Sequence, residues 1–211
     1  MSSYSQQEEL EHLKVWWKTY GASLIIGVLL GITVLVGYRY WIQQRETARE
    51  TASALYDQMI GELRANRPEA RATGEKLIGE YSSTPYASMA TLLLARQAHE
   101  AGDKALARQQ LEWALAHTKD AATQHTARLR LARLLLDAGE LQPAAALVDA
   151  KDTVGFEVEY DELRGDIAIA QGQKDVARMA YRNALKQLAA GSPYIGVITM
   201  KLDDVGPEKQ P

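Results

Sequence analysis

The sequence AGDKALA at residues 101–107 sets a pattern that returns as AGELQPA at residues 138–144 and as QGQKDVA at residues 171–177. In each copy a glycine stands where a helix would end, a polar residue follows it, and an alanine lies five residues after it. The glycines are spaced by 37 and 33 residues. Such a recurrence predicts a chain built from repeated helical units.

Two further positions agree in all three copies and predict how the helices pack. A small residue lies seven positions before each glycine, another lies five positions after it, and a larger apolar residue follows four positions later. These residues are Ala95, Ala132 and Gly165, then Ala107, Ala144 and Ala177, then Leu111, Val148 and Tyr181. Small side chains let two helices lie close together, and the larger side chain fills the groove between them.

This pattern resembles the tetratricopeptide repeat, in which antiparallel helix pairs stack on one another. The consensus Trp and Tyr of the first helix are replaced in all three copies, so the repeats are divergent; the replacements are Thr91 and Ala98, Arg128 and Leu135, and Asp161 and Ala168. The resemblance implies an all-α fold with a tetratricopeptide-like α-solenoid of three to four divergent helix pairs.

The ends of the solenoid are less regular. A fourth unit is expected over residues 47–81, with Asn66-Arg67-Pro68 as its turn, and a C-terminal capping helix over residues 194–205. Residues 153–160 are rich in Val and Phe, which indicates either a short strand or a connector into a helix that begins near Tyr160.

An N-terminal transmembrane helix is predicted over residues 19–38, which carry no charge and include ten Leu, Ile or Val residues. Trp16, Trp17 and Tyr20 flank one end and Tyr38, Tyr40 and Trp41 the other, as aromatic belts do at membrane interfaces. The alternatives are a buried core helix and a cleaved signal peptide, but small residues for a cleavage site are absent after the run. The expected organisation is a tail over 1–18, this helix, and a soluble domain over 39–211.

The numbers of basic residues on the two sides of the helix are nearly equal, so the positive-inside rule leaves the orientation open. Gly27 and Gly31 form a small-x-x-x-small pair that could bring a second membrane helix close.

Composition excludes several classes of function. The chain has 24 Lys plus Arg, 27 Asp plus Glu and no cysteine, which argues against a dedicated nucleic-acid binder, a disulfide scaffold and thiol chemistry. We find no phosphate loop, metal-ligand spacing or nucleophile elbow, and therefore expect no enzyme, cofactor, metal or small-molecule substrate. His12 precedes the membrane helix, and His99, His117 and His125 are expected on helix surfaces or near a helix end.

A stack of helix pairs presents a concave surface lined by the first helix of each pair. The repeat register predicts that Arg96, Arg133 and Asp166 share one inward column. The residues expected around it are His99, Leu129, Leu136, Glu159 and Glu162. Cations followed by acids indicate either a protein partner of mixed charge or an extended segment, or else intramolecular ion pairing and solvation.

The chain as a whole resembles the ancillary subunits of the bacterial SecYEG translocon. The residues that carry the resemblance are the stretch through Trp41, the junction at 80–87 (EYSSTPYA) and the closing MKLDD at 200–204. The resemblance implies a single-pass inner-membrane protein with a cytoplasmic N-terminus and a periplasmic repeat domain. It also implies SecYEG and the membrane-anchored periplasmic chaperone PpiD as partners.

The leading hypothesis is therefore a non-enzymatic docking subunit that links the translocon to periplasmic chaperones. The alternative is a stress-response regulator that sequesters a signalling protein, through its tail or its repeat domain. An envelope enzyme is disfavoured by the residue inventory.

Overall fold

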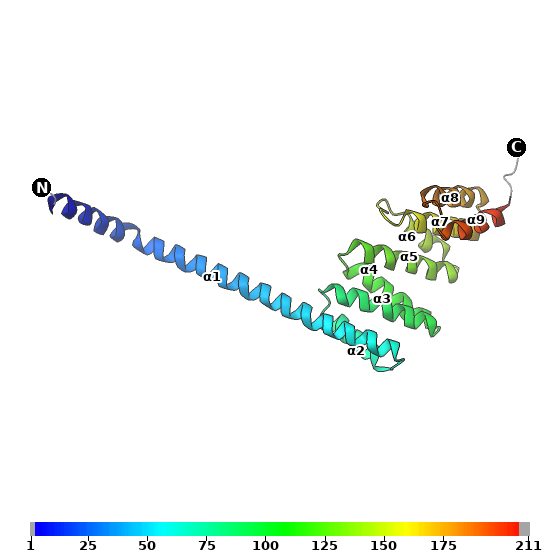
Figure 1. The fold of residues 1–211 in the computed structure, drawn as a ribbon, viewed down its shortest axis with the longest axis horizontal. Helices are drawn as coiled ribbons and strands as arrows, with labels where there is room; N and C mark the ends of the chain where they lie inside the picture. The colour runs from blue at the N-terminus through cyan, green and yellow to red at the C-terminus, as the bar shows by residue number, and fades with distance from the viewer. Residues whose placement is uncertain (1–2, 207–211) are drawn as a thin grey trace. The chain divides into compact units, whose positions relative to one another are not determined.

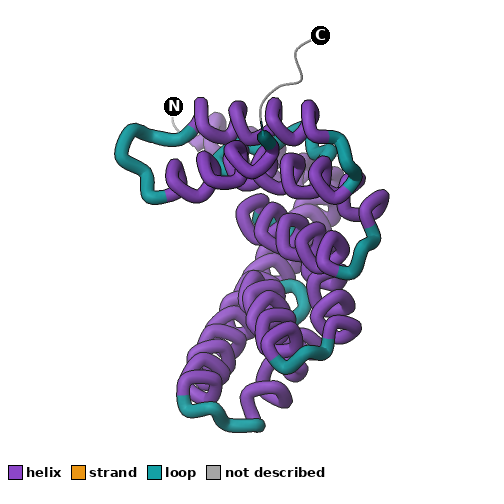
Figure 2. Tube along the Cα trace, turned by 90° about the vertical axis from the view of Figure 1, so that its right-hand side faces the viewer, coloured by secondary structure: helices purple, strands orange, loops and turns teal. Residues whose placement is uncertain are grey.

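The computed structural model describes residues 3–206, with the side chains of Lys14 and of residues 16–206. Within that range every regular element is an α-helix, as Figure 1 and Figure 2 show. The predicted all-α fold is confirmed. The chain divides into two units, the first ending at Thr51 and the second beginning at Ala52.

The helices pair in chain order; the first helix is much longer than the rest and its end belongs to the first pair, and the last helix follows the last pair. They are α1 (Ser3–Arg64), α2 (Glu69–Glu80), α3 (Pro85–Glu100), α4 (Lys104–His117), α5 (Ala121–Asp137), α6 (Leu141–Val148), α7 (Glu157–Ala170), α8 (Lys174–Gln187) and α9 (Tyr194–Val205).

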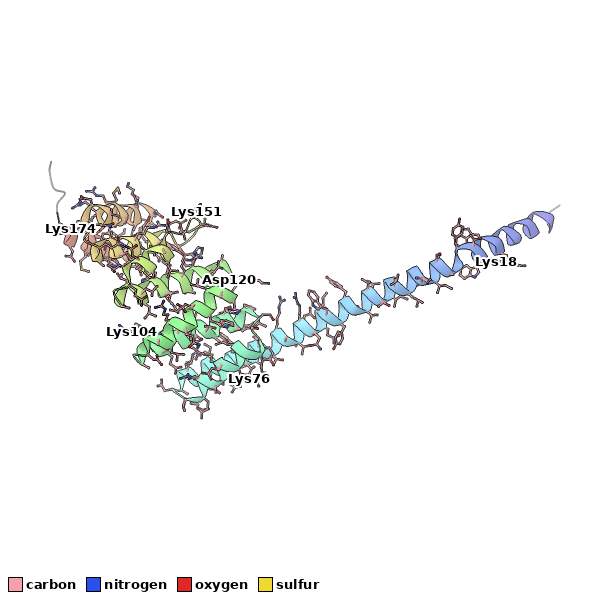
Figure 3. The ribbon with its side chains drawn as sticks, turned by 180° about the vertical axis from the view of Figure 1, so that it is seen from behind. Lys18, Lys76, Lys104, Asp120, Lys151 and Lys174 are labelled. Atoms are coloured by element: carbon pink, nitrogen blue, oxygen red, sulfur yellow. The ribbon has the colours of Figure 1, made fainter. Side chains whose placement is uncertain are left out.

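The first unit presents a bare apolar helical surface. Its ten Leu, Ile and Val side chains between Leu24 and Val36 are 44 to 69% exposed, and Figure 3 shows side chains projecting along this part of α1 beyond Lys18. The helix is long and apolar enough to cross a membrane. The core-helix alternative is wrong, because a core helix would be covered by other elements.

Gly27 and Gly31 have open surroundings, since a Cβ atom added at either would meet nothing within 4 Å. Their contact with another membrane helix stays a prediction. The membrane boundaries at residues 19 and 38 also stay predictions.

The repeated glycine ends a helix in the way the sequence predicts. Gly102 has φ +80°, its N–H donates to His99 O at 2.9 Å, and the N–H of Asp103 donates to Ala98 O at 2.8 Å. This pair of bonds satisfies the last free carbonyls of α3, and only glycine adopts the required backbone conformation at little cost. Gly139 and Gly172 have φ +76° and make the same two bonds at the ends of α5 and α7.

The predicted small positions are buried where paired helices cross. Ala95, Ala107, Ala132, Ala144 and Ala177 are at most 3% exposed, and Gly165 is buried. Leu111, Val148 and Tyr181 are at most 4% exposed. All three aligned columns of the repeat are therefore core positions.

Apolar packing divides the second unit into three successive clusters. The end of α1 packs with α2 and α3 through Met59, Leu77 and Leu94. The largest cluster runs from α3 to α7, and the last joins α7, α8 and α9. Stability is thus distributed along the stack, with no single centre.

The additional helix pair expected over residues 47–81, which comes first along the chain, is present. Its turn lies at Asn66, whose φ is +51°, and it is followed by α2, where Ala70 and Leu77 are fully buried. Here α1 supplies the first helix of the pair.

Residues 153–156 form a connector, and α7 begins at Glu157, three residues before the expected position. The strand alternative is wrong for this stretch.

The expected solvent-exposed position of His125 is also wrong. His125 is 8% exposed, and its Nδ1 lies 3.0 Å from the hydroxyl oxygen of Tyr160. The ring of Phe156 lies 4.9 Å away, centroid to centroid. Because the connector and α7 fold over the start of α5, they cover a histidine that its own helix leaves at the surface. His99 and His117 are exposed as expected.

The expected capping helix is α9. Ile198 and Val205 are buried against α7 and α8. Lys201 donates from Nζ to Glu162 at 2.6 Å and to the two Asp166 oxygens at 2.7 and 2.8 Å. The Tyr181 hydroxyl donates to Asp166 at 2.7 Å, so the cap is held by apolar contact and by a charged cluster.

Replacing Gly165 with alanine is expected to destabilise the second unit by up to about 2 kcal/mol. An added Cβ would lie 2.6 Å from Cδ1 and 2.7 Å from Cζ of Tyr181. At such short distances, an overpacking cost of about 1–3 kcal/mol outweighs the gain of about 1 kcal/mol that alanine gives a helix interior. Urea unfolding of the detergent-solubilised chain measures the difference.

Gly61 provides the control, because a Cβ there meets nothing within 4 Å; Gly61→Ala should stabilise by up to about 1 kcal/mol. Combining Gly165→Ala with Tyr181→Leu should recover part of the loss. A Gly165→Ala variant as stable as the parent would show that the helices tolerate a wider separation.

The free energy of unfolding is expected to decline above pH 10. Burial lowers the pKa of Lys201, but the hydrogen bonds and charges of Asp166 and Glu162 outweigh it and raise that pKa above 10.5. Burial and the hydrogen bond to Asp166 raise the pKa of Tyr181 above 10.0. A group whose pKa is raised by folding contributes its full stabilisation at a pH below its pKa in the unfolded state. That stabilisation is lost as the pH rises through its pKa in the folded state. Unfolding measured from pH 7 to 11 tests this.

Lys201→Met should cost about 1–3 kcal/mol at neutral pH, because buried Glu162 and half-buried Asp166 would lose their nearest cation, and it should flatten the decline above pH 10. Lys76→Met removes an exposed lysine on α2 and should change stability by less than about 0.5 kcal/mol. Equal effects of the two variants would contradict a stabilising role of the cluster.

Candidate protein-interaction site

The residues predicted to line the concave surface lie on the first helices of successive pairs. Arg96 and His99 are exposed on α3, and Arg133 is half-buried on α5. Glu159 and Asp166 are half-buried on α7, whereas Glu162 is buried there. The structure thus places two cations and their neighbours at an accessible surface, and acids on the next first helix.

One predicted member, Leu129, is wrong because it belongs to the core: it is 4% exposed and lies in the largest apolar cluster. Leu136 packs against that cluster but is half-buried. Leu129 therefore leaves no surface for a partner, whereas the role of Leu136 in binding stays a prediction.

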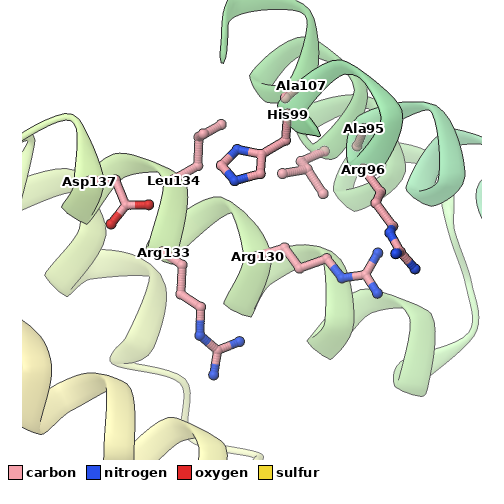
Figure 4. Close-up of a pocket in the computed structure, with 9 residues that line it drawn as sticks. Ala95, Arg96, His99, Ala107, Arg130, Arg133, Leu134 and Asp137 are labelled. Atoms are coloured by element: carbon pink, nitrogen blue, oxygen red, sulfur yellow. The ribbon is translucent and has the colours of Figure 1, made fainter. Parts of the chain in front are cut away.

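A pocket of about 450 Å³ brings together part of the predicted column. Its rim carries Arg96, His99, Arg130, Arg133 and Asp137, from α3 and α5. In Figure 4 the side chain of Arg130 extends toward that of Arg96, and the side chain of Arg133 extends separately from the same helix. The floor is apolar and is formed by Ala95, Ala107, Leu111 and Leu134.

The sequence interpretation missed Arg130. It lies three residues before Arg133, and residues at this spacing share a helix face, so the signal was present in the pattern. Its Nη1 donates to Leu92 O at 3.4 Å, which directs the side chain from α5 toward α3.

The three arginines repel one another. Burial lowers the pKa of Arg130, and the charges of Arg96 and Arg133 lower it further. Asp137 is on the rim of the same pocket, and Glu100 pairs with Arg96 at 2.7 Å in a contact where both side chains are more than half exposed. Exposed pairs of this kind contribute little free energy, and three arginines line this pocket beside one carboxylate, that of Asp137.

A second pocket of about 690 Å³ adjoins the first. It is lined by Arg64 at the end of α1, Arg67 in the turn before α2, and Arg96, which also lines the first pocket. Its apolar lining includes Ile60, Leu63 and Leu93. We call the surface that joins the two pockets the arginine groove, defined by Arg64, Arg67, Arg96, Arg130 and Arg133.

The acids of α7 face a different environment. The side chain of Glu162 is 9% exposed, with Lys201 at 2.6 Å and Arg133 at 3.7 Å. Asp166 is also bound by Lys201, at 2.7 Å. The expected mixed charge of the column is therefore present as an ion-paired acidic end, where Glu162 also contacts Arg133, and an end where arginines outnumber carboxylates.

The chemistry of this surface suits binding. Over the described part of the chain, no group of three or more His, Cys, Asp or Glu residues is arranged to hold a metal ion. The guanidinium groups can donate hydrogen bonds to the carboxylates of a ligand, and the apolar floor can contact one of its apolar side chains.

Comparison with known proteins agrees with this architecture. Residues 14–207 match the family described as tetratricopeptide repeat-like domain. A protein of Haemophilus influenzae is 30% identical over 182 residues, covering 86% of this chain and 89% of the relative. One of Escherichia coli is 28% identical, covering 86% and 88%, and one of Neisseria gonorrhoeae is 27% identical, covering 95% and 97%.

Each of these three relatives bears the name ancillary SecYEG translocon subunit. The similarity extends over the apolar helix and the repeats alike, since the family match begins at residue 14 and ends at residue 207. The chain therefore belongs to the tetratricopeptide repeat-like family of ancillary SecYEG translocon subunits.

Proposed function

We propose that this protein is a membrane-anchored docking subunit of the SecYEG translocon that links it to periplasmic chaperones such as PpiD during protein export. In this role the N-terminus lies in the cytoplasm and the repeat domain in the periplasm. The role is non-enzymatic and requires recognition of protein partners only.

The observation that carries the proposal is the arginine groove, an open charged surface on stacked helix pairs, in a chain that also has a bare apolar helix. Helical repeats bind partners along the surface formed by their first helices. The names of the relatives supply the identity of the assembly.

A membrane anchor suits weak docking contacts. Confinement of two partners to one membrane raises their effective concentration, so a contact of modest affinity is occupied without any new bond. The exposed side chains of the arginine groove fit a contact that forms and releases repeatedly, because rim charges govern association rates more than lifetimes.

Cysteine labelling tests the orientation, because the natural chain has no cysteine. In spheroplasts a membrane-impermeant maleimide should label Lys119→Cys, an exposed site between α4 and α5, and should label Ser5→Cys only after permeabilisation. The inverse pattern would place the repeats in the cytoplasm and would contradict the proposal.

Photocrosslinking in intact membranes tests the docking surface. A photoreactive residue at Arg96 or Arg133 should give adducts with a translocon subunit or a chaperone. Arg71 is the matched control, since it also forms an exposed pair with a glutamate four residues later but lies outside the arginine groove, and it should give few adducts.

Deletion of the repeat domain should remove co-purification of at least one partner. If both partners are retained, the repeats are not the docking surface. Adducts dominated by a signalling protein would instead favour the regulator alternative.

A further inference from the structure

Positive charge in the arginine groove exceeds the negative charge available to it. Two carboxylates line its pockets, Glu100 and Asp137, against five arginines. Glu100 and its partner Arg96 keep 59% and 69% of their side-chain surface exposed. A ligand carboxylate can therefore replace Glu100 at little cost.

The nearest additional acids are already engaged. Lys201 binds Glu162 and Asp166 from α9, and Asp166 also accepts from Tyr181. Glu162 also lies 3.7 Å from Arg133, so that arginine is partly matched, and the excess of positive charge lies mainly at Arg64, Arg67 and Arg130. The cationic half of the surface is left for an external anion.

The groove also offers apolar surface. Leu111 and Leu134 lie beneath the rim of one pocket, and Ile60, Leu63 and Leu93 line the other. Arginine beside a recessed apolar floor is a composition typical of the energetic centres of protein interfaces.

We infer that the arginine groove binds an extended acidic segment of a partner polypeptide, with carboxylates of the segment meeting the guanidinium groups and apolar side chains entering the pockets. This inference rests on the proposed function and specifies the chemistry of the partner. Arginine suits the task because its planar guanidinium binds a carboxylate through two parallel hydrogen bonds.

The order of the arginines favours a linear ligand. They come from the α1–α2 turn, then α3, then α5. Neighbouring packed helices lie about 8–10 Å apart, and an extended chain advances about 3.3 Å per residue. A segment with an acidic residue at about every third position therefore matches the groove.

A flat anionic membrane surface fits less well. Apolar side chains line both pockets beside the arginines, which suits alternating acidic and apolar side chains of a peptide better than the charged headgroups of a bilayer plane. A peptide can enter both pockets in succession.

The test measures binding of a fluorescent peptide to the full chain in non-ionic detergent. The probe is an amidated peptide of about nine residues with Glu at every third position and Leu or Ser between; its counterpart has Gln in place of Glu. We expect the Glu peptide to bind at least about tenfold more tightly, with affinity falling as salt is raised.

The variant that removes three charges, Arg96→Gln with Arg130→Gln and Arg133→Gln, should weaken binding of the Glu peptide about tenfold or more. Arg71→Gln, at an exposed ion pair outside the groove, should change it less than about twofold. Circular dichroism and thermal unfolding verify that both variants are folded.

Equal binding of the Glu and Gln peptides, or equal binding by the triple variant and the parent, would overturn the inference. It would also be overturned if phosphatidylglycerol in mixed micelles displaced the peptide and the triple variant lost that lipid, since the groove would then serve a membrane surface. Co-purification with SecYEG is scored separately. If the chain co-purifies with SecYEG but does not bind the peptide, only this inference fails. If the unmodified chain does not co-purify with SecYEG, the proposed function fails.

Discussion

The close approach of paired helices is the constraint on which the second unit depends. Ala95, Ala132 and Gly165 on the first helices and Ala107, Ala144 and Ala177 on the second helices are all buried, and Tyr181 packs directly over Gly165. The whole chain has one phenylalanine, and its core is filled mainly by alanine and leucine. The core is therefore held together by short distances between helices and by many small van der Waals contacts. The glycine after each first helix allows the chain to reverse without a long loop, which keeps each pair in register.

Most of the fold followed from local pattern. The three glycine turns, the packing columns, the α1–α2 turn at Asn66 and the cap at α9 are all determined by residues close in sequence, and spacing reveals them. The wrong predictions share another origin. His125 is covered by Phe156 and Tyr160, more than thirty residues away along the chain, and Leu129 faces the inside of the stack because of how α5 sits between its neighbours. Burial by a distant element leaves no periodic trace in the sequence.

The candidate site was predictable in part for the same reason. Arg96 and Arg133 recur at equivalent repeat positions, which identifies them, and Arg130 shares their face. The role of Lys201 was not predictable, because it reaches α7 from the last helix across nearly forty residues. Yet this lysine affects the charge of the surface, because it pairs with Glu162 and Asp166, of which Glu162 also contacts Arg133 at 3.7 Å. The last helix thus contributes to the charge balance of the inner surface.

The three separate apolar clusters have a consequence for motion. Because each holds only neighbouring helices, the terminal helix can open locally while the middle of the stack stays folded. Detachment of α9 withdraws the ammonium group from two carboxylates, and these become free to compete for Arg133 and its neighbours. Local opening of α9 would therefore release two carboxylates that compete with a ligand for the arginines. The position of the last helix is in this way coupled electrostatically to the occupancy of the inner surface.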